Sequence, residues 1–291
     1  MHPMGHMGQG GMGAVYRAVD ADGIGVALKL LHPHLAEGSA RDRLAREVSA
    51  LQKVRHPGVA RVLDAELDSA EAFVVTELVE GADLAASVLG SGPLGLSRLD
   101  ELADLAEQLA VALEAVHAAG VLHRDLTPGN VMITVDGPVL IDFGIAQVVE
   151  DARLTSAGQV AGTPGYLSPE LLAGAEPGRR DDWWGWAAVL AFAATGRPPF
   201  GVRPLSAVLA RVRDGEPDLA GIDPRVASVL RRALVLDPEQ RSPHAEVVAA
   251  LRAVADGAVP LEADEDLAAG GTRVLPVEST AATQVVDSGP A

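Results

Sequence analysis

Cysteine is absent from the 291-residue chain. Disulfides, cysteine-ligated zinc, iron–sulfur clusters and thiol catalysis are therefore excluded, and the lack of cysteine fits a cytoplasmic protein. Aromatic residues are scarce at 3%, although 48% of the residues are hydrophobic. The core must therefore be built from alanine, leucine and valine. A chain of this length can bury a sizeable core as one large domain or as two lobes.

Positive charge is also in short supply. Lysine and arginine number 23 against 40 aspartates and glutamates, which gives a net charge of −17. Nucleic acids and anionic membranes bind basic surfaces, so we expect neither as a partner. The longest uncharged apolar run, 183–196, is shorter than the roughly 18–20 residues that cross a bilayer. The first residues lack the basic and apolar regions of a signal peptide, so we expect no membrane segment.

The hydrophobic pattern divides the chain into three parts. Residues 1–80 combine short β-type runs with one amphipathic helix, expected over 40–54. Residues 81–256 are mainly helical. Residues 257–291 are acidic and rich in small residues, and we expect a disordered tail there. The expected strands cover 14–19, 25–31, 59–67, 73–78, 131–134 and 139–141.

Helix signals are clearest in the second part. Ser97 is the expected N-cap of the first long helix, and Gly120 and Gly196 stand where helices should end. The expected helices cover 97–119, 182–195, 204–214, 224–236 and 243–255.

A glycine-rich segment, residues 8–15, has the pattern G-x-G-x-x-G-x-V. Glycines let backbone N–H groups approach phosphate oxygens without obstruction. In a dinucleotide-binding unit such a loop opens a helix, but here a strand is expected at 14–19, which disfavours that site. The Lys-Ser/Thr ending of a P-loop is also missing. Taken alone, the segment is equally compatible with a simple turn.

Two charged residues follow in the first part. Lys29 shares a strand face with Ala27, so it could neutralise phosphate charge while the alanine floors an adenine pocket. Taken alone, Lys29 is better explained as an ordinary surface lysine on an edge strand. Glu47, in the expected helix, is either a solvated side chain or an ion-pair partner for Lys29.

The second part contains His123-Arg124-Asp125-Leu126-Thr127-Pro128-Gly129-Asn130 and then Asp142-Phe143-Gly144. The first segment can set a general base, Asp125, beside a metal ligand, Asn130. The carboxylate of Asp142 is a hard oxygen ligand suited to Mg²⁺. Each motif has an ordinary explanation, but their common order with Ser168-Pro169-Glu170 is very improbable by chance.

In this order the motifs resemble those of protein kinases, specifically bacterial eukaryotic-like (Hanks-type) serine/threonine protein kinases, over about residues 7–255. The resemblance implies an α+β, bilobal protein-kinase fold: a small β-rich N-lobe with one main helix over 1–80, and a larger, mainly helical C-lobe over 81–256. It also implies transfer of the ATP γ-phosphate to Ser or Thr hydroxyls of protein substrates. Glu170 is then expected to pair with Arg241.

The resemblance implies a role for each motif residue. Asp125 would orient the substrate hydroxyl and accept its proton, and Thr163 would brace Asp125. Lys29 would hold the α- and β-phosphates and pair with Glu47. Mg²⁺, or Mn²⁺ in its place, would be held by Asn130 and Asp142.

ATP would be bound between the lobes. Val15 and Ala27 would cover adenine from above and Met132 from below, with Thr76 as gatekeeper. The glycine-rich loop would cover the phosphates, and the hinge would offer backbone groups. The implied nucleotide-binding set is Met7, Gly8, Gly10, Gly11, Gly13, Val15, Ala27, Lys29, Glu77, Val79 and Met132.

Regulation by phosphorylation is also implied. Arg124 places a positive charge beside the catalytic loop, where kinases often bind an activation-loop phosphate. Thr155 is the first candidate phosphosite and Ser156 the second, and a homodimer would allow autophosphorylation in trans.

Two departures from the family pattern leave alternatives open. Thr127 stands where a lysine usually contacts the γ-phosphate, and residues 1–7 lack the apolar strand that normally precedes the glycine-rich loop, so the first strand is expected to be truncated. A pseudokinase, or a weakly active nucleotide-binding scaffold, is the alternative. A small-molecule phosphotransferase of kinase-like fold is a third, although such enzymes lack a segment like 162–170.

Overall fold

The structure is a computed structural model that describes residues 2–10, 13–32, 38–69, 71–144 and 163–257. Residues 1–259 form one compact unit, and everything below concerns that unit. Gly11, the candidate phosphosites Thr155 and Ser156, and the expected tail beyond Gly257 lie outside the described residues. Within the described residues, no helix is both long enough and apolar enough to cross a bilayer.

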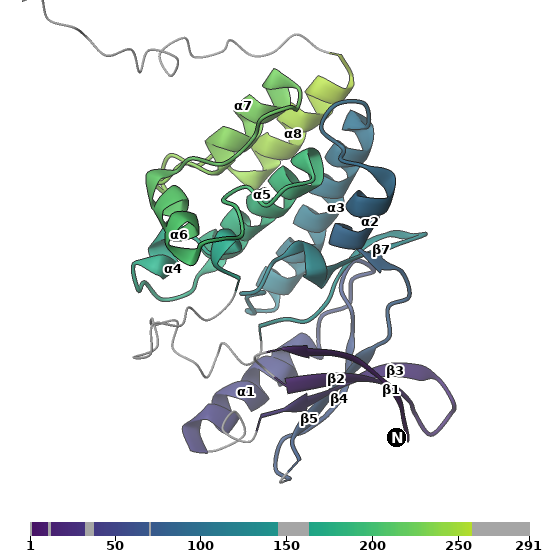
Figure 1. The fold of residues 1–291 in the computed structure, drawn as a ribbon. Coiled ribbons are helices and arrows are strands. Elements are labelled where there is room, and N and C mark those ends of the chain that lie inside the picture. The colour runs from purple at the N-terminus through teal and green to yellow at the C-terminus, as the bar shows by residue number, and fades with distance from the viewer. Residues whose placement is uncertain (1, 11–12, 33–37, 70, 145–162, 258–291) are drawn as a thin grey trace, which may run out of the picture. The chain divides into compact units, whose positions relative to one another are not determined.

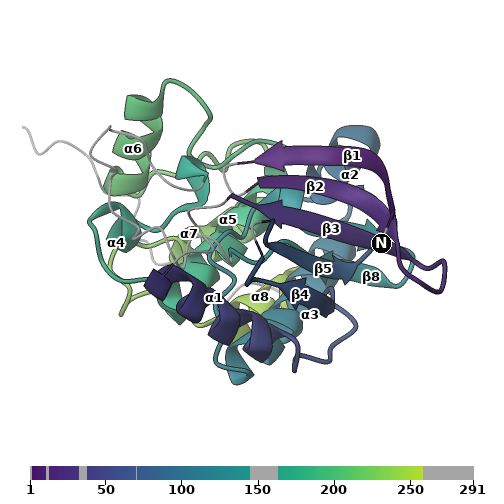
Figure 2. The ribbon, with the colours of Figure 1, turned by 90° about the horizontal axis from the view of Figure 1, so that it is seen from below.

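The N-terminal part is a five-stranded antiparallel sheet with the order β1-β2-β3-β5-β4 (Figures 1 and 2). Helix α1 (Gly38–Leu51) lies beside this sheet. Its apolar residues Leu44, Val48 and Leu51 are buried, as their spacing of four and three predicts. The strands are β1 (His2–Gly10), β2 (Gly13–Val19), β3 (Gly25–Leu31), β4 (Val62–Glu66) and β5 (Phe73–Glu77).

Strand β1 forms where the sequence shows no apolar signal for a strand. It runs from His2 to Gly10 and pairs with β2 along that whole length, with two register irregularities. It lies at the edge of the sheet, and Met7 is exposed. An edge strand is held by backbone hydrogen bonds to one neighbour, so it needs no apolar run of its own.

The larger part is helical and is centred on α5 (Arg179–Thr195), whose residues from Trp184 to Thr195 are all buried. Figure 1 shows α3 and α7 on either side of it. A small sheet, β6-β7-β8, lies against α2 and α3. The other elements are α2 (Leu84–Ser91), α3 (Leu99–Ala118), α4 (Pro169–Leu172), α6 (Leu205–Asp214), α7 (Pro224–Ala233), α8 (His244–Ala255), β6 (Ala82–Asp83), β7 (Val131–Thr134) and β8 (Gly137–Leu140).

The expected elements agree with the observed ones to within a few residues, but four observed elements were not expected, namely β1, β6, α2 and α4. Helix α2 begins at Asp83, whose side chain accepts a hydrogen bond from the N–H of Ala86 at 2.7 Å. Helix α3 has Arg98 at its N-cap with no side-chain cap bond, so Ser97 as the cap is wrong. Gly196 does end α5, in the left-handed conformation.

Candidate active site

The loop between α3 and β7 brings Asp125 and Asn130 together. The Nδ2 of Asn130 donates to the main-chain oxygen of Asp125 at 2.7 Å and to its Oδ2 at 3.0 Å. The short helix Pro128–Asn130 makes this possible, because it turns the chain back toward Asp125. The candidate base is therefore held by the candidate metal ligand, as the spacing of the motif predicts.

Asp182, in the first turn of α5, anchors this loop through hydrogen bonds. Its carboxylate is 2% exposed and accepts hydrogen bonds from the backbone N–H of His123 at 2.9 Å and of Arg124 at 2.8 Å. The Nε2 of His117, on α3, lies 2.7 Å from the same carboxylate. Arg124 has a φ of 64°, a conformation that non-glycine residues rarely adopt. Asp182 therefore stabilises a strained loop directly before Asp125.

Sequence reasoning missed this role of Asp182. It identified the residue only as the start of a helix, and the anchoring depends on two backbone groups that no motif shows. The available signal was the position of Asp182 directly before the almost wholly apolar run 183–195. A carboxylate beside such a run is expected to be buried, and a buried charge requires partners.

His123 connects the loop to the Asp142-Phe143-Gly144 segment. Burial lowers the pKa of His123, so the imidazole is neutral near pH 7. Its Nε2 lies 3.2 Å from the carbonyl oxygen of Ile141, and its ring packs 4.8 Å from the ring of Phe143. The N–H of Gly144 donates back to the His123 oxygen at 2.8 Å. His123 is thus a packing residue between two functional segments.

Lys29 and Asp142 meet across the two parts of the unit. The Nζ of Lys29, on β3, lies 3.1 Å from Oδ1 of Asp142, which follows β8. The lysine side chain is 12% exposed and the aspartate side chain 38% exposed. The structure therefore places an ammonium group beside the second candidate metal ligand.

Glu47 pairs differently from the expectation. Its Oε1 accepts a hydrogen bond from the guanidinium of Arg124 at 2.8 Å, with both side chains less than a fifth exposed. The expected ion pair with Lys29 is thus replaced by one with Arg124. A largely buried guanidinium needs a carboxylate beside it, and α1 presents Glu47 to Arg124 here.

The sheet register gathers several expected nucleotide-binding residues on one face. Val15 lies opposite Lys29, and Ala27 lies opposite Thr76. Directly opposite residues of antiparallel strands share a face. Ala27 and Lys29 are two residues apart on β3, so they also lie on one face. Their side chains are half-buried, as are those of Val79 and Met132.

The glycine-rich loop is described only in part. A Cβ at Gly13 would lie 1.8 Å from the carbonyl oxygen of Leu30, whereas one at Gly8 would meet nothing within 4 Å. Gly13 is therefore required by the close approach of β3, independently of any phosphate. Met7 is exposed, and the N–H of Glu77 donates to the carbonyl of Arg61 at 2.9 Å.

Thr163 does not brace Asp125 here. Its side chain is exposed, and no hydrogen bond joins the two within the described ranges; Asn130 contacts Asp125 instead. The expected pair of Glu170 and Arg241 is formed, with guanidinium-to-carboxylate distances of 2.7 and 2.8 Å. The guanidinium also lies 4.7 Å from the ring of Trp184, which adds a cation–π contact.

The donor set fits a magnesium ion. The amide nitrogen of Asn130 faces Asp125, so its Oδ1 remains to bind a cation, and Asp142 supplies a carboxylate. Mg²⁺ prefers oxygen ligands and usually takes few from the protein.

Known proteins resemble this chain over most of its length. It is 35% identical over 246 residues to the probable serine/threonine-protein kinase PkwA of Thermomonospora curvata, which covers 84% of this chain and 33% of that protein. It is 37% identical over 254 residues to the serine/threonine-protein kinase AfsK of Streptomyces coelicolor, covering 85% and 31%. The serine/threonine-protein kinase PknA of Mycobacterium tuberculosis is 35% identical over 258 residues, covering 84% and 59%. The chain therefore spans about a third of the first two relatives.

A solved structure agrees with the fold. The crystal structure of Rad53 residues 1–466 in complex with AMP-PNP matches with a TM-score of 0.67 and 24% identity, over 84% of this chain and 62% of that one. The sequence profile of the protein kinase domain matches residues 1–250. The chain therefore belongs to the protein kinase domain family.

Proposed function

We propose that this chain is a serine/threonine protein kinase that transfers the γ-phosphate of ATP to Ser or Thr hydroxyls of protein substrates. The convergence of Lys29 and Asp142, from opposite parts of the unit, beside the loop of Asp125 and Asn130 supports this proposal most strongly. The relatives named as serine/threonine kinases support it independently.

Asp125 is the proposed base. Asn130 holds its Oδ2, so Oδ1 is left to accept the proton of the substrate hydroxyl as its oxygen attacks phosphorus. Phosphoryl transfer depends mainly on positioning and on neutralising the charge of the phosphate oxygens. Lys29 supplies a positive charge to the α- and β-phosphates from β3.

Asn130 Oδ1 and the Asp142 carboxylate would hold Mg²⁺, or Mn²⁺ in its place. When bound, the ion supplies charge neutralisation for the phosphate oxygens. Asp142 is well suited to this role because its side chain remains 38% exposed beside Lys29. Val15 and Ala27 above and Met132 below would enclose adenine.

A second function is favoured by Thr127. A neutral hydroxyl gives less charge stabilisation than the lysine usual at this position, so catalysis would be slower. A weakly active nucleotide-binding scaffold, or a pseudokinase, is the alternative that this residue supports.

Regulation would act through Arg124. A phosphate on Thr155 or Ser156 would compete with Glu47 for the guanidinium and release Glu47 toward Lys29. Two copies of the chain would be needed to phosphorylate each other in trans. Peptide mass spectrometry after incubation with Mg-ATP would locate the phosphate, and its absence from both residues would contradict this proposal.

The decisive experiment is an assay of phosphate transfer. The purified chain is incubated with labelled ATP, Mg²⁺ and a generic protein substrate, beside Asp125→Asn and the exposed control Asp22→Asn. We expect label on Ser and Thr, a loss of about 10²–10⁴-fold in Asp125→Asn, and no change in the control. Nucleotide binding without transfer would favour the scaffold, and undiminished transfer by Asp125→Asn would contradict the proposed mechanism.

A further inference from the structure

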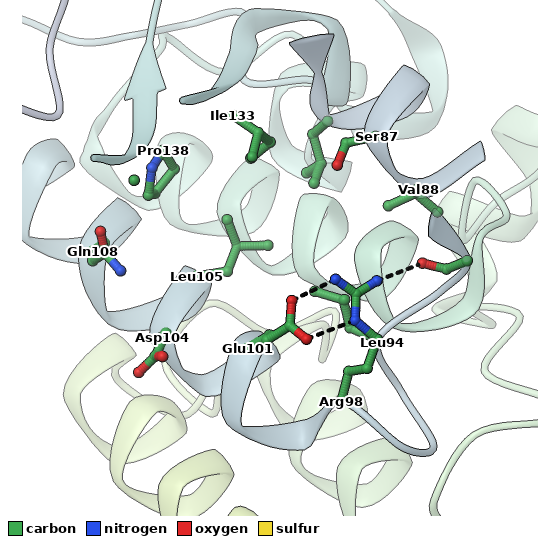
Figure 3. Close-up of a pocket in the computed structure, with 13 residues that line it drawn as sticks. Ser87, Val88, Leu94, Arg98, Glu101, Asp104, Leu105, Gln108, Ile133 and Pro138 are labelled. Carbon is green, nitrogen blue, oxygen red and sulfur yellow. Dashed lines mark hydrogen bonds and ion pairs between the residues drawn. The ribbon is translucent and has the colours of Figure 1, made fainter. Parts of the chain in front are cut away.

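A groove outside the active site runs along α3 beside the hairpin of β7 and β8. It consists of two adjacent cavities of about 220 and 330 Å³ that share Gln108, Gly137 and Pro138. We call the pair the α3 groove. Figure 3 shows the first cavity, with Leu105, Ile133 and Pro138 on its walls.

The walls of the α3 groove are mainly apolar and come from α2, α3, β7 and β8. In the first cavity, α2 contributes Leu84 and Val88, α3 contributes Leu105, and β7 contributes Ile133. In the second, Val111 is 47% exposed although it is a large apolar side chain. Cavities lined mainly by apolar side chains with a few polar groups are typical binding sites.

The rim of the α3 groove carries more carboxylates than cations. Among the described residues, Arg98 is the only cation that lines the first cavity. Its guanidinium already donates to both carboxylate oxygens of Glu101 (Figure 3). It also donates to the carbonyls of Ser91 and Gly92. The hydrogen bond from Arg98 lowers the pKa of Glu101, so this carboxylate stays ionised. Asp104 gives one oxygen to Arg252.

The second cavity repeats this arrangement. It is lined by Glu107, which pairs with Arg252, by Asp136 at the tip of the hairpin, and by His56, whose Nδ1 accepts a hydrogen bond from the N–H of Gly58 at 3.1 Å. Groove carboxylates therefore outnumber the cations that neutralise them, and the whole chain carries a charge of −17. A partner that adds positive charge complements this rim, whereas an anionic partner is repelled.

The shape of the α3 groove favours a chain over a compact molecule. Glu101, Leu105, Gln108 and Val111 follow one another at spacings of four, three and three, so one face of α3 runs along both cavities. An extended peptide places side chains at regular intervals and can fill both cavities in turn.

We infer that the α3 groove binds an extended segment of a protein substrate that carries an apolar side chain beside a basic one. Binding itself is independent of catalysis, while the role in recruiting substrates rests on the proposed kinase function. Ile133 follows Met132 directly on β7, so the groove and the proposed adenine site use opposite faces of one strand.

The test uses a displayed library of random twelve-residue peptides, selected on the whole chain with ADP and Mg²⁺ present. Counter-selection uses Ser87→Trp, which fills the first cavity, and separately Asp136→Arg, which reverses the charge of an exposed turn residue. We expect the retained peptides to combine Leu, Ile or Val with Arg or Lys. Binding of a selected peptide should weaken about fivefold or more in Asp136→Arg.

The matched control is Asp22→Arg, the same substitution in the exposed turn between β2 and β3. It should leave peptide binding unchanged. The inference is overturned if no peptide distinguishes the chain from both groove variants, if acidic peptides are retained, or if Asp22→Arg weakens binding equally. The Asp136→Arg arm does not depend on Ser87→Trp folding.

A second readout addresses substrate recruitment. Fusing a selected peptide to an acceptor sequence should lower KM for that acceptor without changing kcat, relative to a scrambled fusion. An unchanged KM would overturn recruitment. If the chain transfers no phosphate at all, the proposed function fails while peptide binding stands, so the two failures are distinguishable.

Discussion

The two sides of the active site are held by different kinds of interaction. On the helical side, buried Asp182 accepts hydrogen bonds from backbone groups of the catalytic loop. On the sheet side, the contacts are ion pairs between side chains, Lys29 with Asp142 and Glu47 with Arg124. Backbone bonds to a buried carboxylate have no alternative partners, whereas partly exposed ion pairs can exchange. The proposed base, Asp125, is therefore fixed by the fold, and the contacts of α1 are adjustable.

The largest effect is expected at the fixed side. Asp182→Ala leaves two buried N–H groups without acceptors and should reduce the free energy of unfolding by roughly 2–6 kcal/mol. Asp104→Ala, which breaks an exposed pair with Arg252, should cost about 1 kcal/mol or less. Urea unfolding measures both, and similar losses for the two variants would show that Asp182 is not a special anchor.

On the adjustable side, activity should change more than stability. Lys29→Met removes the charge proposed to bind phosphate, so transfer should fall about 10²–10³-fold. The free energy of unfolding should change by about 1 kcal/mol or less, because its partner Asp142 is substantially exposed. Initial rates and thermal unfolding of the same preparation test this; a variant that loses both equally would place Lys29 in the fold rather than the chemistry.

At Thr127, a substitution is expected to preserve or raise the rate of phosphate transfer rather than lower it. Thr127→Lys should leave transfer unchanged or raise it, up to the roughly 5–150-fold that a deficit of about 1–3 kcal/mol represents. The residue is half-buried and directly precedes the short helix that holds Asn130. Steady-state rates at saturating ATP decide the sign, and a large loss would show that position 127 has another role.

A smaller effect is expected for the pair of Glu47 and Arg124. A double-mutant cycle with Glu47→Gln and Arg124→Gln should give a coupling energy of about 1 kcal/mol in unphosphorylated protein. If a phosphate displaces Glu47, the coupling should disappear in protein phosphorylated at Thr155. Persistence of the full coupling after phosphorylation would mean that this pair does not exchange.

The smallest effect on the free energy of unfolding is expected for exposed ion pairs. The hydrogen bond from Arg197 lowers the pKa of Asp218, so the pair stabilises the fold above the usual carboxyl pKa of about 4 and is lost as pH falls below it. Arg197→Gln should therefore cost less than about 1 kcal/mol at pH 7, and less still at low pH, where only the hydrogen bonds from Arg197 to the carbonyls of Thr195 and Ala220 remain. Denaturant unfolding across this range checks the sign, since a cost that grows toward low pH would contradict it.

Much of the fold was predictable because its signals are local. The spacing of Leu44, Val48 and Leu51 shows the buried face of α1, and Gly196 marks the end of α5. Helix α2 was missed because it is short and contains serines and a glycine, so its hydrophobic period is weak. Strand β1 was missed because an edge strand needs backbone pairing rather than apolar residues.

The site was predictable in its members more than in its contacts. The motif order identified Lys29, Asp125, Asn130 and Asp142, and the structure brings these together in two contacting pairs. The partner of Glu47 was predicted wrongly, because it depends on where α1 places its side chain relative to two cations. Such a choice between partners is set by tertiary packing and leaves no trace in residue spacing.

The scarcity of aromatic residues has a practical consequence for spectroscopy. All three tryptophans, at positions 183, 184 and 186, lie in α5, and Trp183 packs edge-on against His117, which contacts the anchor Asp182. Tryptophan fluorescence therefore reports on the surroundings of α5 beneath the loop of Asp125, and no tryptophan reports on the five-stranded sheet. A change in tryptophan emission on adding nucleotide would show, without any attached label, that nucleotide binding alters the surroundings of α5.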